Sequence, residues 1–153
     1  MNNDDLKQKI LTIVPSAELT DPVYEFLNVT VLPADLRKLA EQFNSDPDLS
    51  FDYMFCLTGV DWVTHMMVVY HLYSTKNDHT VVMKVKIDDR ENPEVETLCD
   101  IWKTAEFHER EVYDLFGIKF LNHPDLRRIF LEDDWVGYPM RKDYVDPVNI
   151  VEL

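Results

Sequence analysis

The chain has 153 residues, about the length of one domain, and its 46% hydrophobic and 29% charged residues exclude a disordered protein. Fifteen basic and 29 acidic side chains give a formal net charge of −14, which would repel nucleic acid and anionic lipid surfaces. Three isolated glycines cannot form a glycine-rich phosphate loop, and two distant cysteines without a CxxC motif cannot hold an iron–sulfur cluster or a conventional structural zinc.

The first 45 residues predict a helix, a strand and a second helix. Apolar residues recur at helical spacing over residues 6–14 until Pro15 ends the pattern, and residues 23–32 alternate as a strand does. Pro33 suits the first turn of a helix that extends to about Phe43, with an apolar stripe formed by Leu36, Leu39, Ala40 and Phe43.

Three more strands are predicted at residues 51–57, 66–73 and 81–87, with a hairpin turn at 75–78 between the last two. The second of these strands is apolar on both faces and the third is polar on one face. This contrast is typical of an antiparallel or mixed sheet with helices mainly on one face. The sequence therefore predicts an α+β domain over residues 1–120, with a sheet of about four strands in the order α-β-α-β-β-β-α.

The longest helical pattern begins at Pro93 and runs to about Phe116, with Gly117 as its C-terminal cap. On this helix Glu106, Arg110 and Asp114 share one face, which predicts a ladder of ion pairs. The acidic residues crowd the end of the helix, where the helix dipole disfavours negative charge. We therefore expect basic residues of the following segment to neutralise them, and the candidates are Arg127, Arg128, Arg141 and Lys142.

Residues 121–153 show neither helix nor strand periodicity. Loops longer than about 12–15 residues are usually functional or disordered, and this one carries too many aromatic residues for a disordered linker. We expect an extended arm that docks onto other proteins. The alternative is that it only wraps around its own domain, and the two can apply to different stretches of the arm. The candidate interface residues are those of the types that dominate binding energies: Arg127, Arg128, Trp135, Tyr138 and Arg141.

No self-contained active site is predicted. Glu109 and Glu111 point to different faces of the helix, so they cannot flank one bond, and Arg110 would keep Glu106 and Asp114 ionised. The five histidines form no HExxH motif, and no serine or cysteine lies in a GxSxG context. The residues favour a binding or scaffolding protein without catalytic, cofactor-binding or metal-binding residues, and a free-standing hydrolase using Glu109 or Glu111 is the less favoured hypothesis.

Three segments resemble a known family. EREVYDLFGI at 109–118, HPDLRRI at 123–129 and DDWVGYPMRKDY at 133–144 are similar to the signature segments of the 30 kDa subunit, or C-type subunit, of NADH:quinone oxidoreductase, respiratory complex I. The residues that carry this resemblance and are candidates for partner interfaces are Glu109, Arg110, Glu111, Asp114, Gly117, His123, Pro124, Arg127, Arg128, Asp134, Trp135, Gly137, Tyr138, Pro139, Arg141, Lys142 and Asp143.

The resemblance implies a cofactor-free structural subunit of the peripheral arm of the complex, at the cytoplasmic face of the inner membrane and attached to it only through the complex. Its implied partners are the quinone-pocket subunit, of the D type, and iron–sulfur subunits of the B and I types. NADH, FMN, iron–sulfur clusters and quinone would be bound by other subunits. The whole complex would couple electron transfer from NADH to quinone with proton translocation.

The same segments also fit the equivalent subunit of a related membrane-bound hydrogenase or of a quinone oxidoreductase with another electron donor. The resemblance does not distinguish these from a complex that uses NADH.

Overall fold

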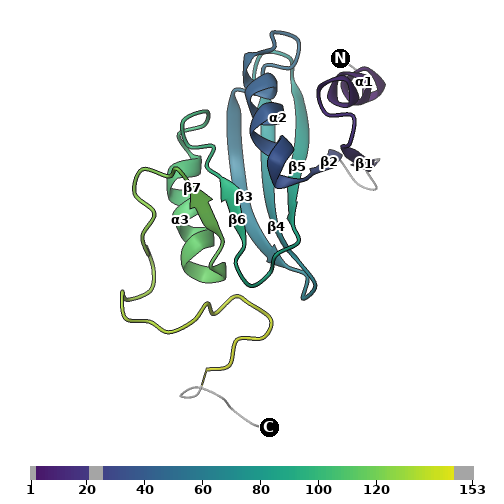
Figure 1. Ribbon diagram of the computed structural model, residues 1–153. Coiled ribbons are helices and arrows are strands. Elements are labelled where there is room, and N and C mark those ends of the chain that lie inside the picture. Colours follow the sequence, from purple (N-terminus) through teal and green to yellow (C-terminus); the bar gives the residue numbers. More distant parts are fainter. Residues whose placement is uncertain (1–2, 21–25, 147–153) are drawn as a thin grey trace.

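The computed structural model describes residues 3–20 and 26–146, which form three helices and seven strands (Figure 1). In chain order these are α1 (Asn3–Ile13), β1 (Glu18–Thr20), β2 (Leu27–Val31), α2 (Pro33–Ser45), β3 (Tyr53–Asp61), β4 (Met66–Ser74), β5 (His79–Ile87), β6 (Glu94–Glu96), α3 (Ala105–Phe116) and β7 (Lys119–Leu121). None of the helices in these ranges is long and apolar enough to cross a membrane.

The main sheet has five strands in the order β1-β2-β5-β4-β3. β2 pairs with β5 in parallel and the other neighbours are antiparallel, so the sheet is mixed, as predicted. Buried residues recur at every second position along β2 and β5, and α2 and α3 lie on the same side of the sheet (Figure 1). The α+β class and the placement of the helices are therefore confirmed.

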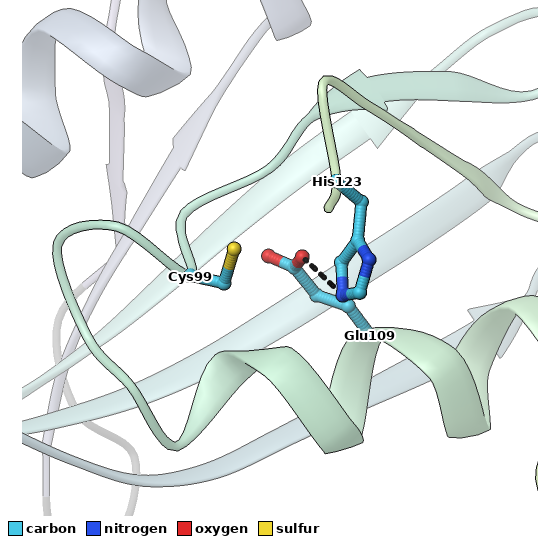
Figure 2. A group of neighbouring side chains, drawn as sticks. All are labelled: Cys99, Glu109 and His123. Carbon is cyan, nitrogen blue, oxygen red and sulfur yellow. Dashed lines mark ion pairs between the residues drawn. The ribbon is translucent and has the colours of Figure 1, made fainter. Parts of the chain in front are cut away.

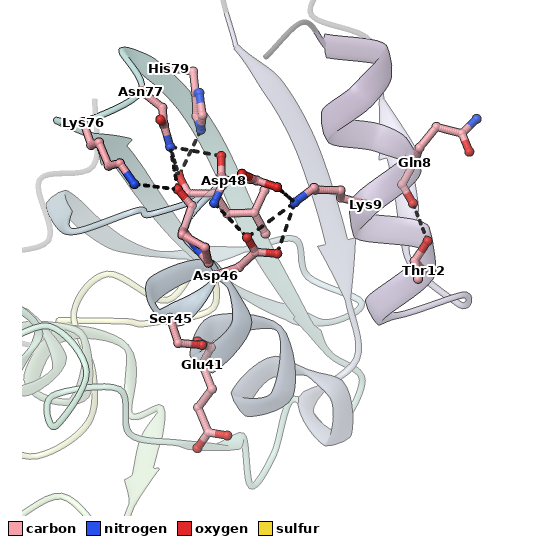
Figure 3. Close-up of polar contacts among 12 residues, drawn as sticks. Gln8, Lys9, Thr12, Glu41, Ser45, Asp46, Asp48, Lys76, Asn77 and His79 are labelled. Atoms are coloured by element: carbon pink, nitrogen blue, oxygen red, sulfur yellow. Dashed lines mark hydrogen bonds and ion pairs between the residues drawn. The ribbon is translucent and has the colours of Figure 1, made fainter.

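Helix α1 is joined to the turn that follows α2 by charged groups (Figure 3). Lys9 Nζ lies 3.2 Å from Asp46 Oδ2 and 2.7 Å from Asp48 Oδ2. Asn77, in the β4–β5 hairpin, donates from Nδ2 to the Asp48 carbonyl at 3.0 Å. These contacts gather three distant parts of the chain at one end of the sheet, well away from α3.

The predicted helix from residue 93 to residue 116 is wrong over its first half. α3 begins only at Ala105, and the residues before it form the short strand β6 and a turn. In β6 the buried Val95 alternates with Glu94 and Glu96, and this strand pairs in parallel with β7. The apolar residues at helical spacing that follow lie in a turn, which is why the sequence pattern is misleading here.

Other elements differ in their limits. The sequence does not predict β1 and β7, and β3 extends to Asp61. The strand predicted at 23–32 is β2 at Leu27–Val31, and residues 23–25 lie outside the described part of the chain. The predicted hairpin at 75–78 is confirmed by the N–H of Asp78, which donates to the Ser74 carbonyl.

Residues 122–146 form the arm, which contains neither helix nor strand. The division of the chain at residue 120 stays a prediction.

Candidate functional site: the contact between helix α3 and the arm

A buried carboxylate on α3 binds the arm. The side chain of Asp114 is 0% exposed, and its Oδ1 lies 2.8 Å from Arg128 Nη1. Its Oδ2 accepts hydrogen bonds from the backbone N–H groups of Ile129, Phe130 and Leu131 at 3.1, 2.7 and 3.0 Å. Burial acts to raise the pKa of Asp114, but these donors outweigh burial and hold the pKa below its usual value.

The predicted ladder of ion pairs on α3 is wrong in its central member. Arg110 is largely buried and donates to the arm, from Nε to the Arg127 carbonyl at 3.2 Å and from Nη2 to the Arg128 carbonyl at 3.1 Å. Backbone carbonyls of a segment without strand partners need such donors. Arg128, in contrast, neutralises the C-terminal acidic residue of the helix, as the sequence predicts.

The C-terminal end of α3 contacts the second half of the arm. Arg141 donates from Nε to the Phe116 carbonyl at 2.7 Å, and the N–H of Met140 donates to the Leu115 carbonyl at 3.1 Å. A cation beside the last carbonyls of a helix is also favoured by the helix dipole. The Arg141 side chain thus caps the helix and fixes the arm in one contact.

Tyr138 packs directly on the helix cap. The guanidinium carbons of Arg128 and Arg141 lie 5.4 and 5.1 Å from the centre of its ring. Gly117 caps α3 at φ +73°, as predicted, and a Cβ built on it would lie 2.5 Å from the Tyr138 ring. Position 117 therefore requires glycine for two reasons, the left-handed backbone and the close approach of the ring.

A second buried carboxylate holds the end of the arm against the main sheet. Asp61, at the end of β3, forms a two-pronged pair with Arg90, with distances of 3.0 and 2.7 Å, and accepts the N–H of Lys142 at 2.9 Å. Arg90 also pairs with Asp143 at 2.8 Å. The Arg90 guanidinium keeps the pKa of Asp61 well below its usual range, although burial opposes this effect.

Sequence reasoning missed Asp61 and Arg90. The available signals were weak: Asp61 ends a long apolar strand pattern, and Arg90 is the one basic residue in an otherwise acidic stretch at 88–91. Neither signal indicates that Asp61 and Arg90 form an ion pair, or that both contact the arm.

A third buried carboxyl lies where the arm begins. Glu109 is 0% exposed, and its Oε1 accepts the N–H of Leu98 at 2.8 Å while its Oε2 accepts the hydroxyl of Thr97. His123 Nε2 lies 3.8 Å from Oε2, and Cys99 is on the other side of the carboxyl (Figure 2). Burial raises the pKa of Glu109 to about 7, although the hydrogen bonds from Leu98 and Thr97 act in the opposite direction.

The remaining predicted residues differ in their exposure to solvent. Glu111 is exposed, so it does face away from the buried Glu109, and the two cannot act on one bond. Arg127 is exposed and pairs with its neighbour Asp125. Gly137 and Pro139 are half-buried, and the predicted residues that are exposed on the arm are Pro124, Arg127, Asp134, Trp135, Lys142 and Asp143.

The fold and these contacts define an α+β domain whose C-terminal segment is fixed to one helix and one strand end by buried charges. The chain belongs to the family of the respiratory-chain NADH dehydrogenase 30 kDa subunit, which it matches over residues 29–148. The resemblance found in the sequence is therefore confirmed.

Individual relatives agree with this family. The chain is 37% identical over 147 residues to the C subunit of NADH-quinone oxidoreductase from Roseiflexus castenholzii, covering 94% of this chain and 84% of that protein. It is 52% identical over 103 residues to the C/D subunit of NADH-quinone oxidoreductase from Phocaeicola vulgatus. That match covers 67% of this chain but only 20% of the relative, so the chain spans about a fifth of the C/D proteins.

Solved structures include a related fold. A chain in the structure of the membrane-bound sulfane sulfur reductase, an archaeal respiratory membrane complex, superimposes with a TM-score of 0.79 at 27% sequence identity. The match covers 95% of this chain and 86% of that chain. The likeness thus includes most of both chains.

Proposed function

We propose that the chain is a structural subunit of the peripheral part of NADH:quinone oxidoreductase and that the outer side of its arm docks onto neighbouring subunits. The observation that carries this proposal is the two-sided arm. Its arginines and backbone groups bind α3, while Phe130, Val136 and Met140 are 65%, 86% and 55% exposed. Large apolar side chains that are exposed on a fixed segment are typical of protein interfaces.

A second group of exposed side chains extends this surface. Trp62 and Val63, just after β3, are 53% and 59% exposed, and Lys142 Nζ of the arm lies 5.9 Å from the centre of the Trp62 ring. The residues after β3 therefore lie beside the end of the arm, and we include them in the proposed docking surface.

We propose the quinone-pocket subunit, of the D type, and iron–sulfur subunits of the B and I types as the partners. The relatives named as C/D subunits support a D-type neighbour, because one polypeptide there carries both names. In this proposal NADH, FMN, the iron–sulfur clusters and quinone are bound by other subunits, and this chain supplies no catalytic residue. It lies at the cytoplasmic face of the inner membrane and is attached there only through the complex.

The proposed docking is tested with a double variant of exposed side chains on the arm, Phe130→Asp with Val136→Asp. Both side chains are exposed, so the fold should remain stable to within about 0.5 kcal/mol. Loss of two central interface residues should weaken association by about 2 kcal/mol or more, roughly 30-fold. We would measure recovery of the D-type subunit with the tagged chain from native membranes, together with NADH:quinone activity.

The matched control is Leu11→Asp, since Leu11 is an exposed apolar residue of α1 at the other end of the molecule. The control should leave assembly unchanged. Undiminished recovery of the partner with the double variant, or equal loss with the control, would contradict the proposal.

The alternative is the equivalent subunit of a related membrane complex with another electron donor. The likeness to a chain of the sulfane sulfur reductase complex favours keeping this candidate. The composition of the purified complex distinguishes the two: a flavoprotein subunit that binds NADH supports the first, and a complex without one supports the second. The hydrolase hypothesis gains no support, because both oxygens of Glu109 are buried in hydrogen bonds.

A further inference from the structure

We propose that Cys99, Glu109 and His123 form a binding site for a divalent transition-metal ion of the Zn²⁺ type. One ligand atom from each residue lies within 4.8 Å of the other two, and the three come from the turn after β6, from α3 and from the start of the arm (Figure 2). Thiolate, carboxylate and imidazole are the three ligand types that Zn²⁺ accepts.

The spacing needs only a small contraction. Zn²⁺ binds N, O and S ligands at about 2.0–2.3 Å, which places neighbouring ligand atoms of a tetrahedral site roughly 3.3–3.8 Å apart. His123 Nε2 and Glu109 Oε2 are already 3.8 Å apart. The sulfur of Cys99 has to approach the other two ligand atoms by at most about 1.3 Å to complete the set.

The burial of Glu109 favours a nearby cation when the carboxyl group is ionised. Its carboxyl group is fully buried and is held by neutral donors, the hydroxyl of Thr97 and the N–H of Leu98. A buried carboxylate without a positive partner is strongly disfavoured. The hydroxyl of Tyr70 is also buried without a hydrogen-bond partner in the described part of the chain, and it is near enough for the Glu109 charge to act on it.

The surroundings allow an ion to arrive. Cys99 and Thr97 line a surface hollow of about 430 Å³, together with Arg37, Lys103 and Asn122. Cys99 itself is 5% exposed, so only a small part of this residue is open to the hollow. A water molecule from the hollow completes the fourth position of the metal.

Metal binding requires a change at His123. Without a metal, the N–H of Asp125 donates to Nδ1 and Nε2 donates to the Glu106 carbonyl at 2.9 Å. Binding through Nε2 moves the ring proton to Nδ1, so the N–H of Asp125 must turn away, and the Cys99 thiol must release its proton. Asp125 is exposed in a turn, where its N–H can bond to water instead.

The test is titration of the metal-free full chain with Co²⁺, a spectroscopic substitute for Zn²⁺. We expect one equivalent to bind, with a sulfur-to-cobalt charge-transfer band and the intense visible bands of a four-coordinate site, and Zn²⁺ should displace it. Cys99→Ser should abolish the charge-transfer band. Glu109→Gln and His123→Gln should each weaken binding about tenfold or more.

Cys56→Ser is the matched control, because Cys56 is a half-buried free cysteine on β3. It should bind Co²⁺ as the unchanged chain does. Absence of the charge-transfer band in the unchanged chain, or its loss in Cys56→Ser, would overturn the proposal.

Two further measurements cover variants that fold poorly. X-ray absorption of the zinc-loaded unchanged chain should show one sulfur ligand at about 2.3 Å with nitrogen and oxygen ligands beside it. Added Zn²⁺ should raise the Tm of the unchanged chain and of Cys56→Ser. A first shell of oxygen alone, or an unchanged Tm, would mean an adventitious ion only.

Discussion

The sheet and the arm are stabilised in opposite ways. In the sheet, apolar side chains such as Leu72, Met83 and Val85 are fully buried and face α2 and α3. In the arm, most residues are exposed or half-buried, and many of its contacts to the domain are polar, with the buried carboxylates Asp114 and Asp61 among the main partners. Apolar burial does not depend on protonation, whereas both carboxylates must be ionised to bind the arm.

Because of this difference, we expect substitutions in the sheet and substitutions in the arm to destabilise the protein in different ways. Loss of an apolar side chain weakens the whole sheet, while loss of one carboxylate releases part of the arm and leaves an arginine without its partner. The following predictions test that separation.

The largest effect is expected for Asp114→Ala. This variant leaves Arg128 without its carboxylate and the N–H groups of residues 129–131 without an acceptor. Breaking a buried pair in this way costs about 3–5 kcal/mol. Urea unfolding should show the loss, and hydrogen exchange should show faster exchange of the amides of residues 129–131.

Glu111→Gln is the control for this variant, because Glu111 lies on the same helix but is exposed. Its stability should stay within about 0.5 kcal/mol of the unchanged chain. If amide protection at 129–131 survives in Asp114→Ala, the proposed role of the carboxylate is wrong.

Leu72→Ala should affect the sheet. Leu72 is fully buried on β4, and removal of its side chain creates a cavity that costs about 2–5 kcal/mol. Because no charge is involved, we expect the same loss at pH 7 and at pH 4.5 in urea unfolding. A loss of stability that differs strongly between the two pH values would contradict the proposed difference between the sheet and the arm.

Gly117→Ala should have an intermediate effect. Alanine is strained at φ +73°, and its Cβ would lie 2.5 Å from the Tyr138 ring, so the ring must move from between Arg128 and Arg141. We expect a cost of about 1–3 kcal/mol in thermal unfolding. Gly137→Ala, at φ +87° but with 3.0 Å to the nearest ring, should cost less.

The smallest effect under mild conditions is the pH dependence of the arm. The pKa values of Asp114 and Asp61 lie below the ordinary value for aspartate, about 3.9. Their stabilisation is therefore complete above about pH 5 and is lost as the pH falls through the folded-state pKa values. Hydrogen exchange at pH 5 and pH 3 should show earlier opening of the arm than of β4 and β5. Simultaneous opening would contradict this prediction.

Periodicity predicts α1, α2 and most of the sheet, but neither the start of α3 nor the contacts of the arm. The apolar patterns along residues 66–73 and 81–87 locate β4 and β5, since burial of one face of a strand leaves a repeat of two. Pro33 and Gly117 locate the start of α2 and the end of α3 for equally local reasons. The turn at 98–104 is wrongly predicted as helix because its apolar spacing imitates one.

The candidate site can be predicted in part. The sequence indicates that arginines of the arm neutralise the end of α3, and Arg128 does so. It cannot indicate that Arg90 pairs with both Asp61 and Asp143, because pairing of distant charges leaves no repeat in the sequence. The same holds for Cys99, Glu109 and His123, which share no known spacing and meet only because the turn after β6, α3 and the arm converge.

The separation of Asp61 from Lys142 along the chain bears on how the protein is made. The N–H of Lys142 reaches the Asp61 carboxylate across 81 residues, whereas Arg128 reaches Asp114 across 14. Chains emerge from the ribosome N-terminal end first, and closing long loops is slow. Asp61 consequently has at most Arg90 as a partner until residue 142 has been synthesised, so its contact with the arm forms after the contact between Asp114 and Arg128.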